Sequence, residues 1–124
     1  MRVLFVDDEP NVLDSIRRQL RKSCEVLTAT SGVESMALLK ATGPVALVIS
    51  DMRMPGMDGA QLLEKVREHD PNIGRILLTG YADINSTVAA INRGEIHRYI
   101  AKPWDDQDLL LVVSEALTRR DLEA

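Results

Sequence analysis

Three consecutive acidic residues near the start of the chain could take part in chemistry. Asp7, Asp8 and Glu9 directly follow the apolar run Val3 to Val6. Neighbouring carboxylates repel one another, and a bound cation removes that cost; a cluster of oxygen ligands favours a hard cation such as Mg²⁺. Acidic residues also favour the first turn of a helix, so this feature alone predicts a metal site and an ordinary helix start about equally.

A fourth acid stands at the end of another apolar run. Asp51 follows the run Val45 to Ser50 and precedes a short loop, Met52 to Gly59, that contains one proline and two glycines. If the two runs are strands of one sheet that flank its ligand-binding edge, Asp51 faces Asp7 and Asp8. Buried unpaired charges each cost roughly several kcal/mol, so packing alone does not explain this convergence. We interpret it as a functional site.

A hydroxyl and an ammonium group follow two later apolar runs. These groups belong to Thr79-Gly80 and Lys102-Pro103. A lone threonine or lysine at the end of a strand is usually structural or solvated. Beside the acids, however, the two groups supply what a phosphoryl group needs: a cation and hydrogen-bond donors for its oxygens, next to a metal that offsets the acidic charge.

Five alternations of strand-like and helical apolar spacing must position these residues. The predicted strands are Val3 to Asp7, Glu25 to Ala29, Val45 to Ser50, Arg75 to Thr79 and Tyr99 to Ala101. Helices are predicted from Pro10, from a capping box at Ser31 to Glu34, after Gly59 as far as about Pro71, around Ile84 to Ile91 and from about Asp105. Short connections imply right-handed crossovers and an open, doubly wound sheet, in which ligands bind beyond the carboxyl ends of the strands.

The composition is that of one ordinary globular domain. The chain has 124 residues, of which 45% are hydrophobic, 27% charged and only 3% aromatic, so aliphatic side chains must form the core. The formal charge of -4 disfavours direct binding of nucleic acid. The single Cys24 cannot form an internal disulfide, and we recognise no secretory, lipidation or membrane-spanning segment. We therefore expect a cytoplasmic protein.

From Arg2 to about Leu117 the chain resembles the receiver domains of bacterial two-component response regulators. The resemblance rests on the order of the motifs: the acidic pair, Asp51 with its downstream Pro-Gly-Met-Asp-Gly loop, then Thr79 and Lys102-Pro103, each at the end of a strand. It implies an α/β, flavodoxin-like (CheY-like) fold with a doubly wound five-stranded parallel sheet in the order 2-1-3-4-5 and five helices. Residues 1–124 would form this one receiver domain.

The resemblance also implies a phosphorylation site. Asp51 would be the nucleophile that takes a phosphoryl group from a phosphohistidine of a sensor histidine kinase or phosphotransfer protein. The implied cofactor is Mg²⁺, held by Asp8, by Asp51, by the backbone carbonyl of Arg53 and, through a water molecule, by Asp7.

A switch is implied around this site. Lys102 would pair with the new phosphoryl group, the hydroxyl of Thr79 would move towards it, and Tyr99 would swing inward as the signal carrier. A plain core role for Tyr99 stays open. The Lys102-Pro103 bond is expected to be cis. Arg53 and Tyr81, each two places beyond a site residue, are expected to shield the acyl phosphate from water and so to tune its lifetime.

The sequence departs from the common receiver pattern before the fifth predicted strand. The segment Gly94 to Tyr99 is one residue longer than usual and lacks the usual alanine. This segment and residues 102–106 resemble receivers joined to HD-GYP-type cyclic-di-nucleotide phosphodiesterases or to hydrogenase-type transcription regulators. We expect an output domain outside this chain, unless the receiver acts alone. A homodimer through the fourth helix and fifth strand also fits the family.

Three alternative functions fit parts of this pattern. A Mg²⁺-dependent phosphatase of the haloacid dehalogenase type has an aspartate two residues after its nucleophile, whereas Glu9 stands two residues after Asp7. A flavodoxin-like FMN module needs a phosphate-binding first loop, which the acidic run would repel. A degenerate receiver that acts only as an interaction module, without phosphorylation, is disfavoured by the intact acids, Thr79 and Lys102. We therefore expect a signalling domain rather than an enzyme.

Overall fold

The computed structural model describes residues 2–80, 83–92, 98–101 and 106–123, in which strands and helices alternate. The strands are β1 (Arg2–Val6), β2 (Glu25–Ala29), β3 (Leu47–Asp51), β4 (Gly74–Thr79) and β5 (Arg98–Ala101). The helices are α1 (Pro10–Leu20), α2 (Gly32–Thr42), α3 (Gly59–His69), α4 (Ile84–Asn92) and α5 (Asp106–Glu123). This confirms the predicted alternation, with shifts of a residue or two at the ends of several strands.

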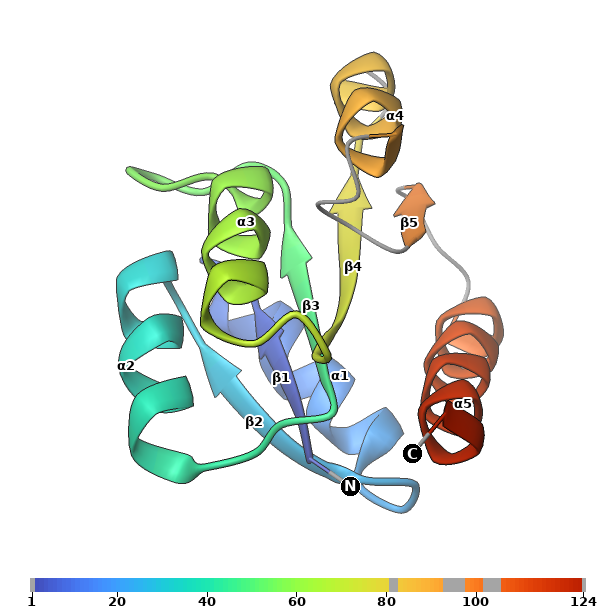
Figure 1. The fold of residues 1–124 in the computed structure, drawn as a ribbon. Helices are drawn as coiled ribbons and strands as arrows, with labels where there is room; N and C mark the ends of the chain where they lie inside the picture. Colours follow the sequence, from blue (N-terminus) through green and yellow to red (C-terminus); the bar gives the residue numbers. More distant parts are fainter. Residues whose placement is uncertain (1, 81–82, 93–97, 102–105, 124) are drawn as a thin grey trace.

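All the strands run parallel in one sheet with the order β2-β1-β3-β4-β5. This is the predicted order, and it reverses between β1 and β3, so these two strands flank the switch point of the sheet. Figure 1 shows the helices on both faces: α2 and α3 lie on one side, and α1 and α5 lie on the other. Such a sheet is covered from both sides, which explains why its central strands read as nearly continuous apolar runs.

Two mainly aliphatic cores hold the layers together. One core joins α1 and α5 to the sheet and includes Phe5, Ile16 and Leu109; the other joins α2 and α3 to the opposite face and includes Leu4 and Leu63. Every residue of β3 and of β4 is buried. Because burial of one aliphatic side chain contributes roughly 1.5–3 kcal/mol, these central strands are the most firmly held part of the sheet.

The helix starts follow local side-chain chemistry, with one correction to the sequence analysis. Ser31 caps α2 as predicted, since its hydroxyl accepts from the amide of Glu34 at 3.1 Å. The Glu34 carboxylate does not complete a capping box, however; it accepts from the hydroxyl of Thr30 at 2.9 Å. The full capping box lies at α3, between Asp58 and Gln61. This capping box was not predicted, although Asp58 and Gln61 have the spacing of three residues that it requires.

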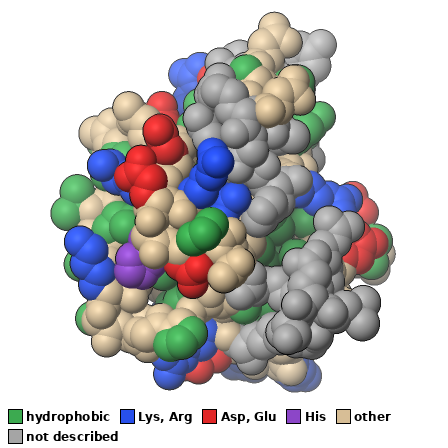
Figure 2. Space-filling model, in the orientation of Figure 1, with side chains coloured by type: hydrophobic (Ala, Val, Ile, Leu, Met, Phe, Trp, Pro, Cys, Tyr) green, Lys and Arg blue, Asp and Glu red, His purple; other side chains and the backbone are tan. Residues whose placement is uncertain are grey.

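The described surface mixes polar, charged and apolar side chains. On the face in Figure 2, the hydrophobic side chains form separate small areas between charged ones. No helix among the described residues combines the length and the apolar character needed to cross a membrane.

Gly59 allows α3 to begin directly against the end of β3. Its amide donates to the carbonyl of Met52 at 2.8 Å. A β-carbon at this position would clash with the backbone carbonyl oxygen of Asp51 and would lie 2.7 Å from Cδ1 of Leu77. Only glycine therefore fits between the start of α3 and the strand end that carries Asp51.

We predict that Gly59→Ala lowers the free energy of unfolding by roughly 1–3 kcal/mol, because the added methyl group overpacks a contact with backbone that cannot move aside. Urea unfolding measures the change. Gly80→Ala is the matched control, since a β-carbon there meets no atom within 4 Å. A Gly59→Ala variant as stable as the Gly80→Ala variant would contradict the prediction.

Candidate functional site

The register of the sheet brings two of the predicted acids together. Val6 is the partner of Ser50 in the parallel pair of β1 and β3, so the next residues, Asp7 and Asp51, stand side by side at the carboxyl ends of these strands. The amide of Asp7 donates to the carbonyl of Ala29 at 3.2 Å, which holds the first acid in line with β1. The sequence predicted this convergence from strand order, and the register confirms it.

Asp7, Asp8 and Asp51 form one cluster of carboxylates. Each offers an oxygen, and these oxygens lie within 4.8 Å of one another. Asp7 is only 2% exposed and Asp51 only 5%, whereas Asp8 is exposed. The amide of Glu9 donates to Oδ1 of Asp7 at 2.9 Å and fixes that side chain. A set of oxygen ligands this close together, open to solvent at one side, fits a hard divalent cation.

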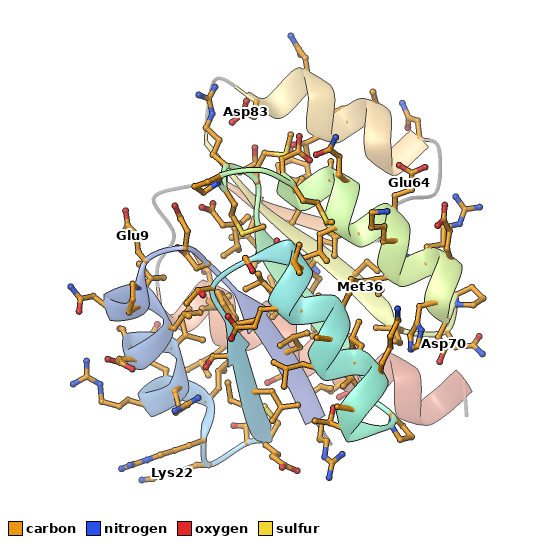
Figure 3. The ribbon with its side chains drawn as sticks, turned by 90° about the vertical axis from the view of Figure 1, so that its left-hand side faces the viewer. Glu9, Lys22, Met36, Glu64, Asp70 and Asp83 are labelled. Carbon is orange, nitrogen blue, oxygen red and sulfur yellow. The ribbon has the colours of Figure 1, made fainter. Side chains whose placement is uncertain are left out.

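Glu9 does not belong to the cluster. It precedes the first residue of α1, Pro10, as the cap residue of that helix, and its side chain is exposed. Figure 3 shows Glu9 at the start of α1 and Asp83 at the start of α4, both at the same end of the molecule. Of the three consecutive acids, two therefore face the site and the third begins a helix.

The side chain of Arg53 reaches from the loop after β3 to the start of α4. Its Nε donates to Oδ2 of Asp83 at 2.9 Å and its Nη2 donates to Oδ1 at 3.2 Å. The hydrogen bond and the charge of Asp83 raise the pKa of the Arg53 guanidinium above its ordinary value. The pair stands beside an open hollow of about 460 Å³, whose lining residues are Met52, Arg53, Met54, Pro55, Asp58 and Asp83. Nothing in the sequence analysis indicated Asp83, because this contact joins residues 30 positions apart.

Thr79 is fully buried, and its hydroxyl is directed to α4 by a contact that the sequence analysis also missed. Its Oγ1 lies 3.2 Å from Oγ1 of Thr87 and 3.2 Å from the carbonyl oxygen of Gly80. Thr87 is likewise fully buried. The only signal in the sequence was a threonine next to the apolar positions of the predicted fourth helix.

The remaining predicted residues are partly described. Tyr99 pairs with Leu77 across β4 and β5, is half-buried and packs against the core on the α2 and α3 side. Its position is compatible with both roles that the sequence left open. Tyr81, Lys102, Pro103 and the segment 94–97 lie outside the described residues.

Comparison with known proteins agrees with this geometry. The sequence profile of the response regulator receiver domain matches residues 3–114. The hydrogenase transcriptional regulatory protein HoxA of Cupriavidus necator is 40% identical over 121 residues, which are 98% of this chain and 25% of that protein. The chain thus spans about a quarter of the length of this curated relative.

Solved structures are similar over nearly the whole chain. The signal receiver domain of an HD domain-containing protein from Pseudomonas fluorescens Pf-5 has a TM-score of 0.88 and 39% identity, and the similarity covers 97% of this chain and 96% of that one. The response regulator receiver domain protein from Clostridium thermocellum has a TM-score of 0.91 and 31% identity, with 99% and 98% covered. The matches to a hydrogenase regulator and to an HD domain-containing protein agree with the subgroup indicated by the sequence. The chain belongs to the family of response regulator receiver domains.

Proposed function

We propose that this receiver domain is switched by phosphorylation of Asp51. The observation that carries the proposal is the carboxylate cluster: Asp51 ends a fully buried strand beside Asp7 and Asp8, at the switch point of the sheet. Receiver domains of response regulators are signalling modules rather than enzymes, and receivers as a family typically bind Mg²⁺ at an acidic pocket of this kind. We infer the same use here, with residues 1–124 acting as one domain.

The proposed reaction is an in-line phosphoryl transfer. A carboxylate oxygen of Asp51 attacks phosphorus, a P–O bond forms, and the P–N bond of the donor phosphohistidine breaks and leaves the imidazole. Asp8, Asp51 and the carbonyl of Arg53 would hold Mg²⁺ directly, with Asp7 holding it through water. When bound, the cation supplies neutralisation of charge on the transferred group. The fixed position of Asp51 at the end of β3 supplies the orientation that such a displacement needs.

Two further residues would bind the phosphoryl group. Lys102 would pair with its oxygens as a cation, and Thr79 would donate its hydroxyl hydrogen to one of them. The half-buried position of Tyr99, next to β4, supports its proposed role as the side chain that turns inward after Thr79 moves. The cis form of the Lys102-Pro103 bond stays a prediction.

A phosphodonor and an output element are the proposed partners. The donor would be a sensor histidine kinase or a phosphotransfer protein. The chain corresponds to a quarter of the length of HoxA, a hydrogenase transcriptional regulatory protein, so we propose that an output domain outside these residues receives the signal. A homodimer through α4 and β5 and a cytoplasmic location stay predictions.

Incubation with a small phosphodonor tests the acceptor. We expect wild-type protein to gain one phosphoryl group by intact mass in the presence of Mg²⁺ and none in its absence, because Asp51 needs the cation to offset the charge of the donor. Asp51→Ala should gain none. Asp14→Asn, which neutralises an exposed acid of α1 outside the cluster, is the control and should behave as wild type. If wild-type protein gains no phosphoryl group, the domain acts instead as an interaction module.

Neutralising Asp8 should have opposite effects on stability with and without metal. Without Mg²⁺, Asp8→Asn removes one of three like charges and should raise the free energy of unfolding by roughly 1 kcal/mol at low ionic strength. With Mg²⁺, wild-type protein should become more stable by mass action, and the variant should gain much less. Thermal unfolding in EDTA and in Mg²⁺ measures both effects, with Asp14→Asn as the control. If Mg²⁺ stabilises wild-type protein and Asp8→Asn equally, Asp8 is not a ligand.

The lifetime of the acyl phosphate should depend on Arg53 and Tyr81. We expect the double change to alanine to accelerate loss of the phosphoryl group by several-fold, because water then reaches Asp51 more easily. The decay is followed by intact mass after removal of the phosphodonor. Asp83→Asn is a companion variant, since it weakens the hold on the Arg53 side chain by removing the charge of its partner, without making Arg53 smaller. An unchanged decay rate in the double variant would refute the shielding role.

A further inference from the structure

Thr87 is an unexpected buried polar residue in α4. It is fully buried, whereas its apolar neighbour Val88 is 41% exposed. The rotation of α4 thus directs a hydroxyl group, rather than the adjacent valine, at β4. A buried hydroxyl without a hydrogen bond costs free energy, so a threonine at this position depends on polar partners.

Two partners are available to this hydroxyl. Oγ1 of Thr87 lies 2.9 Å from the carbonyl oxygen of Asp83 and 3.2 Å from Oγ1 of Thr79. A hydroxyl group has one hydrogen to donate and can also accept. If Thr87 donates to Asp83, its oxygen accepts the hydrogen of Thr79; if Thr87 donates to Thr79, the hydrogen of Thr79 goes to Gly80. In both arrangements the hydroxyl of Thr79 is engaged on the α4 side.

We propose that Thr87 is a positioning residue that holds the Thr79 hydroxyl against α4 in the unphosphorylated protein. The inference rests on the proposed function, in which this same hydroxyl must donate to a phosphoryl group on Asp51. In either arrangement, moving this hydroxyl to the phosphoryl group breaks its contact with Thr87. Helix α4 and the phosphoryl group therefore compete for Thr79, and the Thr79–Thr87 contact opposes the phosphorylated state until the phosphoryl group replaces it.

The start of α4 has a second contact with the site, the ion pair of Asp83 with Arg53, and solvent weakens this contact. The carboxylate of Asp83 binds Arg53, whose side chain is 75% exposed, so water and salt screen this ion pair. The hydroxyl contact between Thr79 and Thr87 is fully buried, and water cannot replace a lost partner there. The threonine pair is thus the contact whose loss shifts the position of Thr79.

Binding of beryllium fluoride, a phosphoryl mimic, in the presence of Mg²⁺ tests the proposal by calorimetry. Thr87→Val keeps the shape of the side chain and removes its hydroxyl, so it should tighten binding of the mimic by about two- to tenfold, the range expected for one hydrogen bond. Thr87→Ser keeps the hydroxyl and should bind as wild type. In a Thr79→Val background, Thr87→Val should leave the affinity unchanged, because the competed hydroxyl is absent.

A second measurement uses the protein without the mimic. If the two hydroxyls contact each other, the urea midpoint of the Thr79→Val, Thr87→Val double variant should fall by less than the sum of the two single losses. Additive losses would show that the hydroxyl groups of Thr79 and Thr87 do not interact. Unchanged affinity of Thr87→Val, or the same tightening in the Thr79→Val background, would overturn the competition while leaving phosphorylation of Asp51 intact. Failure of wild-type protein to bind the mimic, together with no phosphoryl gain at Asp51, would instead overturn the proposed function and this inference with it.

Discussion

Mutual repulsion among three carboxylates is the interaction on which the site depends. Asp7 and Asp51 are almost completely buried, and Asp8 closes the cluster from the solvent side. Carboxylates this close together destabilise the fold unless other groups or a cation offset their charge. The covered parallel sheet meets this cost because the aliphatic cores on its two faces hold β1 and β3 in register. The burial of these strands therefore lets the fold tolerate a cluster of negative charge at its edge.

The two sides of Asp51 are held by different kinds of contact. On the α3 side, backbone meets backbone: Gly59 lies directly against the carbonyl of Asp51, and its own amide binds the carbonyl of Met52. On the α4 side, side chains make the contacts, through Arg53 with Asp83 and through Thr79 with Thr87. Backbone packing of the first kind has no alternative arrangement nearby, whereas side-chain hydrogen bonds can exchange partners. The α4 side of Asp51 is therefore held by contacts that can exchange partners, whereas the α3 side is held by fixed backbone packing.

Helix α4 joins a buried hydrogen bond to an exposed surface. Its buried Thr87 faces the sheet, while its exposed Val88 faces solvent on the neighbouring position of the same turn. A small rotation or shift of the helix would change both positions together, because they belong to one rigid turn. The contacts of Asp83 at the start of α4 fix where this turn begins. A buried hydrogen bond and an exposed surface are thus parts of one short element.

Local patterns in the sequence predicted the order of the elements and, to within a residue or two, the ends of the strands. Apolar runs of strand length followed by helical spacing predicted the alternating fold, and the positions of Asp7, Asp51 and Thr79 after such runs placed them at one edge of the sheet. These features follow from local periodicity and chain order, which the sequence shows without a structure. Two features depend instead on tertiary packing: the rotation of α4, which buries Thr87 and exposes Val88, and the pairing of Arg53 with Asp83. Both features depend on how a segment packs against others that are distant in the chain. The spacing of side chains along one helix does not specify the rotation of that helix when a polar and an apolar residue of similar shape, such as threonine and valine, are neighbours.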